Sequence, residues 1–242
     1  MSYLSFPVAT QHQIEEDISL GSMQKDVTYQ LEKLSMELGV STEEIQQVLP
    51  SLVRKGLVKS TDEDSIKILG LPNSQVESVF QYAQKFKLKP RTVVREVRVE
   101  EADQVIAGIL DLDAGDPIFI QVRTRLVDEQ VLANQYNFLP YEICPGLEAV
   151  DLTRRSFQVT LSEDFHTVIT RMEETYFLGT PERDDKEILG VSDDTKILIV
   201  QRTSFSRSDY PLVFADIHVN PAQFHYVEDL WPKALPLVNS LK

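Results

Sequence analysis

The sequence has 242 residues, of which 42% are hydrophobic and 26% are charged, a composition typical of globular domains with a substantial core. Its formal net charge is −14, which argues against strong nucleic-acid binding, because a polyanion is normally met by a basic protein face. No apolar run reaches the roughly 18 residues of a membrane span, the N-terminus lacks a secretory signal pattern, and the single cysteine excludes an internal disulfide, so we expect a cytoplasmic protein without membrane contact.

The first seventy residues have the pattern of three helices and a hairpin. Apolar residues at helical spacing predict helices over 9–20 and 31–38, and a glycine follows each. Ser41 and Glu44 form a capping box that opens a third helix. Residues 56–69 then read as two short strands around a polar turn. This order is typical of a winged helix-turn-helix.

The rest of the chain contains an internal duplication. The segment ILDLDAGDPIFIQVRT (109–124) returns as ILGVSDDTKILIVQRT (188–203). After a two-residue insertion, 132–140 aligns with 213–221. Each copy reads as β-α-β-β, so six mostly antiparallel strands predict one domain built from two halves. A groove between such halves is a natural ligand site.

These patterns predict an α+β protein with two domains and a connector. A winged helix-turn-helix covers 1–70, a linker with a short amphipathic helix covers 71–90, and a pseudo-duplicated β-α-β-β antiparallel-sheet domain covers 91–242. In the C-terminal tail, we expect Trp231 to dock onto its own domain or onto a partner.

The order and spacing of several short motifs carry a family resemblance. They are Leu34…Leu38-Gly39-Val40-Ser41 and Gly56-Leu57-Val58 in the first domain, and Arg123-Thr124-Arg125, Phe138-Leu139-Pro140, Ser156-Phe157 and Leu189-Gly190-Val191 in the second. In these the chain resembles GntR-family transcription regulators of the HutC subfamily, which join a winged helix to a UTRA domain of chorismate-lyase-like fold. The resemblance implies a homodimer, operator DNA as a partner, no cofactor, and a small metabolite effector that alters operator affinity.

The predicted DNA-binding helix departs from the family pattern. The family's arginines are replaced by Glu32, Thr42 and Gln46, and its usual threonine by Glu44. Arginine is the commonest reader of guanine, whereas glutamine can read adenine. The remaining candidates for DNA contact are Ser41, Thr42, Gln46, Gln47 and Lys33, with Arg54, Lys55 and Lys59 as further backbone contacts. Two alternatives stay open: DNA recognition is retained, or the domain keeps its fold and has lost it.

Arg123 and Arg125 are the main candidates for ligand binding. They lie two apart on a predicted strand, so both guanidinium groups project from one face. Two such groups suit a phosphate or a carboxylate held by paired hydrogen bonds. The alternative is a solvated sheet face whose arginines pair with nearby carboxylates. The resemblance favours the ligand site, because the matching arginines of the family contact the anionic part of the effector.

There are four further ligand candidates, three from the resemblance and one, Ser74, from its place at the start of the predicted connector helix. Ser156 matches a family serine that helps to bind the anion, Gln158 stands where the family has a tyrosine, and Gln135 stands where it often has a glutamate. Ser74 could offer its hydroxyl to an anion or could simply cap a helix. These changes, with no acid directly after Pro211, imply an effector other than the usual amino-sugar phosphate.

No catalytic or metal-binding pattern stands out in the sequence. The four histidines are scattered without metal-ligand spacing, and glycine-rich phosphate loops are absent. His218 on a predicted strand reads as a satisfied sheet residue rather than a general base. We therefore expect no enzyme and no bound metal. A chorismate-lyase-like activity stays open as an alternative, because Arg123 could hold such an anionic substrate.

Overall fold

The computed structural model describes residues 7–73, 89–152 and 157–241. The first part folds as predicted into three helices and a hairpin, and a short strand missed by the sequence analysis, β1, joins that hairpin to give the sheet order β1-β3-β2. The elements are α1 (Val8–Leu20), β1 (Thr28–Gln30), α2 (Leu31–Leu38), α3 (Thr42–Arg54), β2 (Val58–Asp62) and β3 (Ser65–Ile68).

Local signals explain these boundaries. Gly21 and Gly39 end α1 and α2 with φ of 80° and 69°, a left-handed conformation that favours glycine. Before α3, Ser41 Oγ accepts from Glu44 N at 3.1 Å, and Glu44 Oε2 accepts from Ser41 N at 3.0 Å. The predicted capping box is therefore present, and it commits the Glu44 carboxylate to the start of the helix.

The second part is built on one six-stranded antiparallel sheet, in the order β4-β5-β6-β9-β8-β7. Its strands are β4 (Pro90–Glu101), β5 (Pro117–Val127), β6 (Gln130–Pro140), β7 (Arg171–Gly179), β8 (Ile197–Phe205) and β9 (Pro211–Val219). Its helices are α5 (Gln104–Leu110), α6 (Phe157–Asp164), α7 (Arg183–Leu189), α8 (Val227–Leu230) and α9 (Leu235–Asn239), with 3-10 turns at Tyr141–Ile143 (η1), Leu147–Ala149 (η2), Pro221–Tyr226 (η3) and Pro232–Ala234 (η4). Within the described ranges, no helix is long and apolar enough to cross a membrane.

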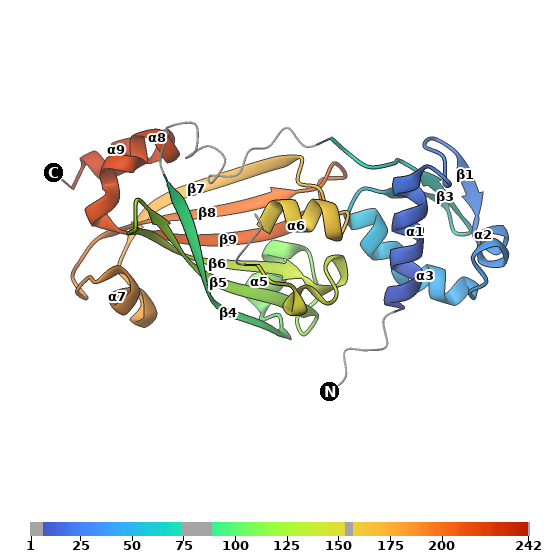
Figure 1. The fold of residues 1–242 in the computed structure, drawn as a ribbon, viewed down its shortest axis with the longest axis horizontal. Helices are drawn as coiled ribbons and strands as arrows, with labels where there is room; N and C mark the ends of the chain where they lie inside the picture. Colours follow the sequence, from blue (N-terminus) through green and yellow to red (C-terminus); the bar gives the residue numbers. More distant parts are fainter. Residues whose placement is uncertain (1–6, 74–88, 153–156, 242) are drawn as a thin grey trace.

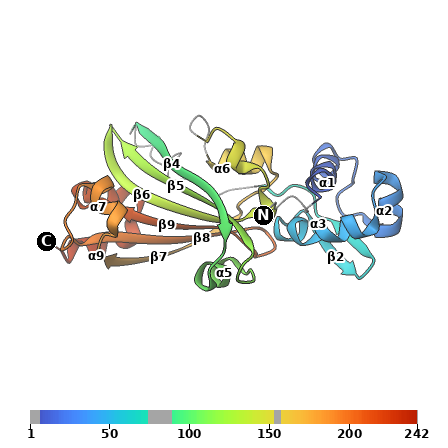
Figure 2. The ribbon, with the colours of Figure 1, turned by 90° about the horizontal axis from the view of Figure 1, so that it is seen from below.

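The two faces of the sheet are covered by different kinds of segment. Helices α5 and α7, which belong to the repeat, pack on the same face through Ile118 and Ile197. The other face carries α6 at one end, against Phe119, and the C-terminal helices at the other end, against Ile217. Figure 2 shows α6 and α5 on opposite sides of the sheet, and Figure 1 shows α6 next to the winged helix, with α8 and α9 at the far end.

The strand register confirms the duplication and corrects its alignment. Arg123 lies opposite Gln135, and its counterpart Arg202 lies opposite Ala215. Gln135 is therefore equivalent to Ala215 and not to Asp216, so the second copy carries one inserted residue instead of two. The difference matters because a slip of one residue moves a side chain to the other face of the sheet.

Two elements differ from the sequence expectations. Helix α6 was not predicted, since its eight residues are too few to give a clear helical period. The segment HTVITRMEETYFL (166–178) reads as a strand in the sequence, but β7 begins only at Arg171, because Thr167 N turns back to donate to Leu161 O of α6 at 2.8 Å. Most of the helix predicted within 71–90 lies outside the described residues.

Candidate functional site

A cavity lies over the centre of the sheet, on the face that α6 covers. Its floor comes from both halves of the duplication, with Arg123 and Arg125 on β5 and Arg202 on β8. Phe157 and Gln158 of α6 line it from above. Its empty space is about 500 Å³, including open solvent at the mouth. This is the groove between halves that the duplication predicts.

Arg123 is a buried cation in this cavity without a counter-ion among the described residues. It is 6% exposed, its Nε has no hydrogen-bond partner, and its Cζ lies 5.1 Å from the centre of the Phe157 ring. Burial lowers the pKa of Arg123, and the charges of Arg125 and Arg202 lower it further. A guanidinium keeps its proton in proteins, so this lowering expresses the free-energy cost of an uncompensated buried charge.

Arg123 and its duplicated counterpart Arg202 have different partners on their neighbouring strands. Arg202 lies opposite Glu174 of β7, and the two side chains form an ion pair with Nε 2.6 Å from Oε1. The equivalent partner of Arg123 is Val94 of β4, which has no charge to offer. One arginine of the duplicated pair is therefore neutralised, and the other has no such partner on the neighbouring strand.

Arg125 donates to two neutral side chains on the neighbouring strands. Its Nε donates to Gln135 Oε1 at 3.1 Å and its Nη1 donates to Thr92 Oγ1 at 2.7 Å, while Gln135 Nε2 donates to Asn137 Oδ1 at 2.8 Å. Burial and the charge of Arg202 lower the pKa of Arg125 to about 10. The cavity thus gathers three guanidinium groups in a chain with a net charge of −14, which makes it a local attractor for anions.

Residues 86–225 match the family model of the UTRA domain. The chain belongs to the UTRA family. A search of curated proteins found the HTH-type transcriptional regulator GgaR of Escherichia coli K12, 20% identical over 80% of this chain and 78% of that protein. Among solved structures, PhnF from Mycobacterium smegmatis has a TM-score of 0.57 at 18% identity, over 88% of this chain and 95% of that one. YydK from Bacillus subtilis has a TM-score of 0.52 at 18% identity, over 89% and 95%.

The winged helix ahead of a UTRA domain is the arrangement that the sequence resemblance implied. The chain is a GntR-family transcription regulator with a UTRA effector-binding domain, as predicted. The relative GgaR is named as a transcriptional regulator, and YydK as a possible transcriptional regulator. Its structural relatives are 18% identical, so they bear on the fold and leave the ligand to the residues of this chain.

The UTRA cavity brings together four of the six predicted ligand residues: Arg123, Arg125, Gln135 and Gln158. The other two, Ser74 and Ser156, lie outside the described residues. The expectation of a solvated sheet face does not hold for Arg123, which is buried. Arg202 also lines the cavity and was not predicted to do so, although its alignment with Arg123 in the duplication was the signal that could have found it.

Most of the residues predicted to contact DNA lie at the start of helix α3. Of the predicted contacts, Gln46, Gln47 and Lys33 are exposed and Thr42 is half-exposed. Lys33 lies beside Glu37, with 3.8 Å between Nζ and Oε1. Ser41 is exposed, but its hydroxyl accepts from Glu44 N in the capping box. This surface therefore presents amide and hydroxyl groups and few cations.

Arg54, at the end of α3, is not available for DNA backbone contacts. It is 8% exposed and reaches into the UTRA domain, where it binds Glu142 Oε1 at 2.7 Å, Leu110 O at 2.8 Å and Asp111 O at 2.7 Å. Its guanidinium also lies 5.4 Å from the centre of the Tyr210 ring. The sequence prediction for Arg54 is wrong because the residue docks the winged helix onto its own effector domain.

Lys55 is also unavailable for DNA backbone contacts, and it is more deeply buried than Arg54. Its ammonium group is inaccessible to solvent and lies 2.5 Å from Glu15 Oε1 of α1 and 2.7 Å from Phe165 O of the UTRA domain. Burial lowers the pKa of Lys55, and the charge and hydrogen bond of Glu15 oppose that effect. Arg207, in the turn between β8 and β9, adds hydrogen bonds to the carbonyls of Leu69 and Gly70.

The wing carries acidic residues at its tip. Asp62 at the end of β2, and Glu63 and Asp64 in the turn before β3, are all exposed. In a winged helix that approaches DNA, such a tip would place carboxylates near phosphates and weaken the complex. Exposed or half-exposed cations nearby include Lys25, Lys59 and Lys67, and Lys67 is paired with Asp26, with 2.9 Å between Nζ and Oδ1.

A second polar cluster lies on the opposite face of the sheet, under α7. His218 Nδ1 is 2.5 Å from Asp185 Oδ2, and His218 Nε2 is 3.4 Å from Asp216 Oδ2. Burial by itself would lower the pKa of His218, but its two carboxylate partners raise it to about 9. The cluster ties α7 to the sheet, so His218 is the satisfied sheet residue that the sequence predicts. Among the described residues, no group of His, Cys, Asp or Glu could hold a metal ion.

Proposed function

We propose that this regulator binds a small anionic metabolite in the UTRA cavity, with the anion on Arg123 and Arg125. The observation that carries the proposal is the Arg123 guanidinium, buried and unpaired among the described residues. An isolated buried charge is expensive, and an anion would compensate it with short charge-assisted hydrogen bonds. Gln135 and Gln158 would supply amide groups that donate to and accept from the rest of the metabolite.

The test exploits the cost of an unpaired cation in the free protein. We expect Arg123→Met to leave the free protein as stable or more stable, because it removes an uncompensated buried charge. The same variant should lose the thermal stabilisation given by hits from a screen of anionic metabolites, since such stabilisation follows binding by mass action. Arg98→Met is the matched control, because Arg98 is a half-exposed arginine paired with Glu100 on β4.

Two results would overturn the ligand proposal. One is a variant that still responds to the same anions as the unchanged protein. The other is a large loss of stability in the free Arg123→Met protein, which would give Arg123 a structural role instead.

We further propose that the winged helix binds operator DNA through the start of α3, where Gln46 and Gln47 are exposed. A gel-shift titration against salt tests this. Operator binding should weaken steeply as the salt concentration rises, with a slope that reports the number of phosphates neutralised. The homodimer implied by the resemblance, and a cytoplasmic location, belong to this proposal. Light scattering in solution checks the dimer.

A second candidate function is a metabolite-binding regulator that acts through protein contacts without touching DNA. The burial of Arg54 and Lys55 and the acidic wing favour it, because both remove positive charge from the DNA-facing surface. Selection of bound sequences from a random DNA pool separates the two candidates. An enriched motif supports operator binding, and a pool that stays random at low salt supports the second candidate.

A further inference from the structure

A second cavity adjoins the anion site and has a different chemical character. It lies between the sheet and the C-terminal helices, and its empty space is about 440 Å³, including open solvent. Arg125, Gln135 and Arg202 line both cavities. Beyond these three, the lining of the second cavity is apolar, and includes Ala133, Ile217 and Leu230. The two cavities therefore share a polar border formed by Arg125, Gln135 and Arg202.

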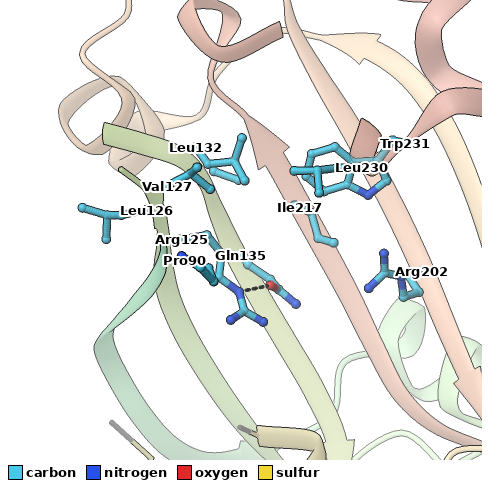
Figure 3. Close-up of a pocket in the computed structure, with 11 residues that line it drawn as sticks. Pro90, Arg125, Leu126, Val127, Leu132, Gln135, Arg202, Ile217, Leu230 and Trp231 are labelled. Carbon is cyan, nitrogen blue, oxygen red and sulfur yellow. Dashed lines mark hydrogen bonds between the residues drawn. The ribbon is translucent and has the colours of Figure 1, made fainter. Parts of the chain in front are cut away.

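Trp231 closes the apolar end of this second cavity. Figure 3 shows its indole beside Leu230 at one end, with Arg125 and Gln135 joined by a hydrogen bond at the other. The indole is 2% exposed, yet its Nε1 is a buried donor without a hydrogen-bond partner among the described residues. A buried donor left unsatisfied carries a desolvation penalty, which a ligand acceptor would remove.

From this geometry we propose that the effector is an amphipathic anion that spans both cavities. Its charged group lies on Arg123 and Arg125, and its apolar body extends past the Arg202–Glu174 ion pair along Ala133 and Ile217 to the indole. An acceptor on that body receives a hydrogen bond from Trp231 Nε1. The inference rests on the proposed function, since it requires that the arginines hold the anionic group.

The arrangement of the arginines supports an elongated ligand over a compact one. Arg125 and Arg202 come from different halves of the sheet and border both cavities. A small inorganic anion would satisfy the guanidinium groups and leave the Trp231 donor unpaired. A polar body such as a sugar would bury hydroxyl groups against Ile217 and Leu230 without partners, which is unfavourable.

The single tryptophan of the chain makes this proposal directly measurable. Because Trp231 is the only tryptophan, its fluorescence reports on the second cavity without interference. We would titrate the full chain with inorganic phosphate, acetate, butanoate and hexanoate, and measure affinity by calorimetry alongside the fluorescence. Affinity should rise about fourfold for each added methylene group that is buried. Phosphate and acetate should bind without changing the tryptophan signal, whereas hexanoate should change it.

Two variants and one neutral ligand test whether the apolar part of the effector lies in the second cavity. Ala133→Leu fills the second cavity, so it should abolish the dependence on chain length and leave acetate binding unchanged. Trp231→Phe keeps the apolar surface and removes the donor. The parent protein should bind 5-oxohexanoate, which carries a keto acceptor near its apolar end, more tightly than hexanoate. Trp231→Phe should lose that difference and leave hexanoate binding unchanged. Hexanol, which has no charge, should bind far more weakly than hexanoate.

The outcomes separate this inference from the proposed function. If acetate and phosphate bind through Arg123 but affinity does not rise with chain length, the inference fails and the proposed function stands. If chain length matters equally in the Ala133→Leu variant, the apolar body lies elsewhere and the inference also fails. If no anion of either kind binds, both fail together.

Discussion

Lys55 and Glu15 form an ion pair that is shut away from solvent, although they belong to different helical segments of a strongly acidic winged helix. The Lys55 ammonium also donates to Phe165 O, which follows α6 directly. Since α6 carries Phe157 and Gln158 of the anion cavity, one short helix links that cavity to the end of α3. A shift of α6 on ligand binding would therefore act first on this pair.

Breaking the pair from one side should be costly. We expect Lys55→Met alone to lower the free energy of unfolding by about 3–5 kcal/mol, because it leaves Glu15 as an uncompensated buried carboxylate. The double variant with Glu15→Leu should recover much of that loss, since it removes both charges. Urea unfolding of the full chain measures both values. Lys33→Met is the control, and its exposed pair with Glu37 should contribute less than about 1 kcal/mol. A double variant as unstable as the sum of its singles would contradict this account.

Arg54 should determine whether the two domains unfold together. Arg54→Lys keeps a positive charge near Glu142 but cannot reproduce the fork that binds the Leu110 and Asp111 carbonyls. We expect the parent protein to unfold in a single calorimetric transition, and the Arg54→Lys variant to unfold in two, with the winged helix unfolding at the lower temperature. Arg91→Lys, at an exposed pair with Glu129, should leave the transition unchanged. One undivided transition in both variants would show that the docking does not depend on Arg54.

The charge of the wing tip should set the nonspecific affinity for DNA. Glu63→Lys replaces an exposed carboxylate with a cation, so it should strengthen nonspecific binding and steepen the salt dependence by about one phosphate contact. Gel shifts at several salt concentrations measure the slope. Glu101→Lys makes the same change on an exposed position of β4 and is the matched control. Equal effects of the two substitutions would show that net charge matters and the wing does not.

The His218 cluster should make stability depend on pH in the alkaline range. The pKa of His218 is raised from its ordinary value of 6.5 to about 9 in the folded protein. Its contribution is therefore complete below about pH 6.5 and is lost as the pH rises through about 9. We expect the melting temperature to fall over this window, and His218→Gln to remove that part of the fall. A parent and variant with parallel curves would exclude His218 as the cause.

The sequence predicted those elements whose residues repeat at a clear helical or strand period. Local patterns predicted the hairpins β2-β3, β5-β6 and β8-β9, helices α5 and α7, and the capping box at Ser41. They also predicted that Arg123 and Arg125 lie on one face of a strand. Helix α6 escaped prediction because it is short, and its burial depends on the distant β5 strand. The roles of Arg54 and Trp231 depend on contacts with residues far away in the chain, which no local pattern encodes.

The unequal partners of the two duplicated arginines bear on stoichiometry. A sheet with perfect internal symmetry would offer the same site twice and accept a ligand in two opposed orientations. Glu174 breaks that equivalence by occupying one arginine, while Val94 leaves the other open. We therefore expect one effector molecule per chain, bound in a single orientation. Binding should then cause the same conformational change at the winged helix in every occupied chain.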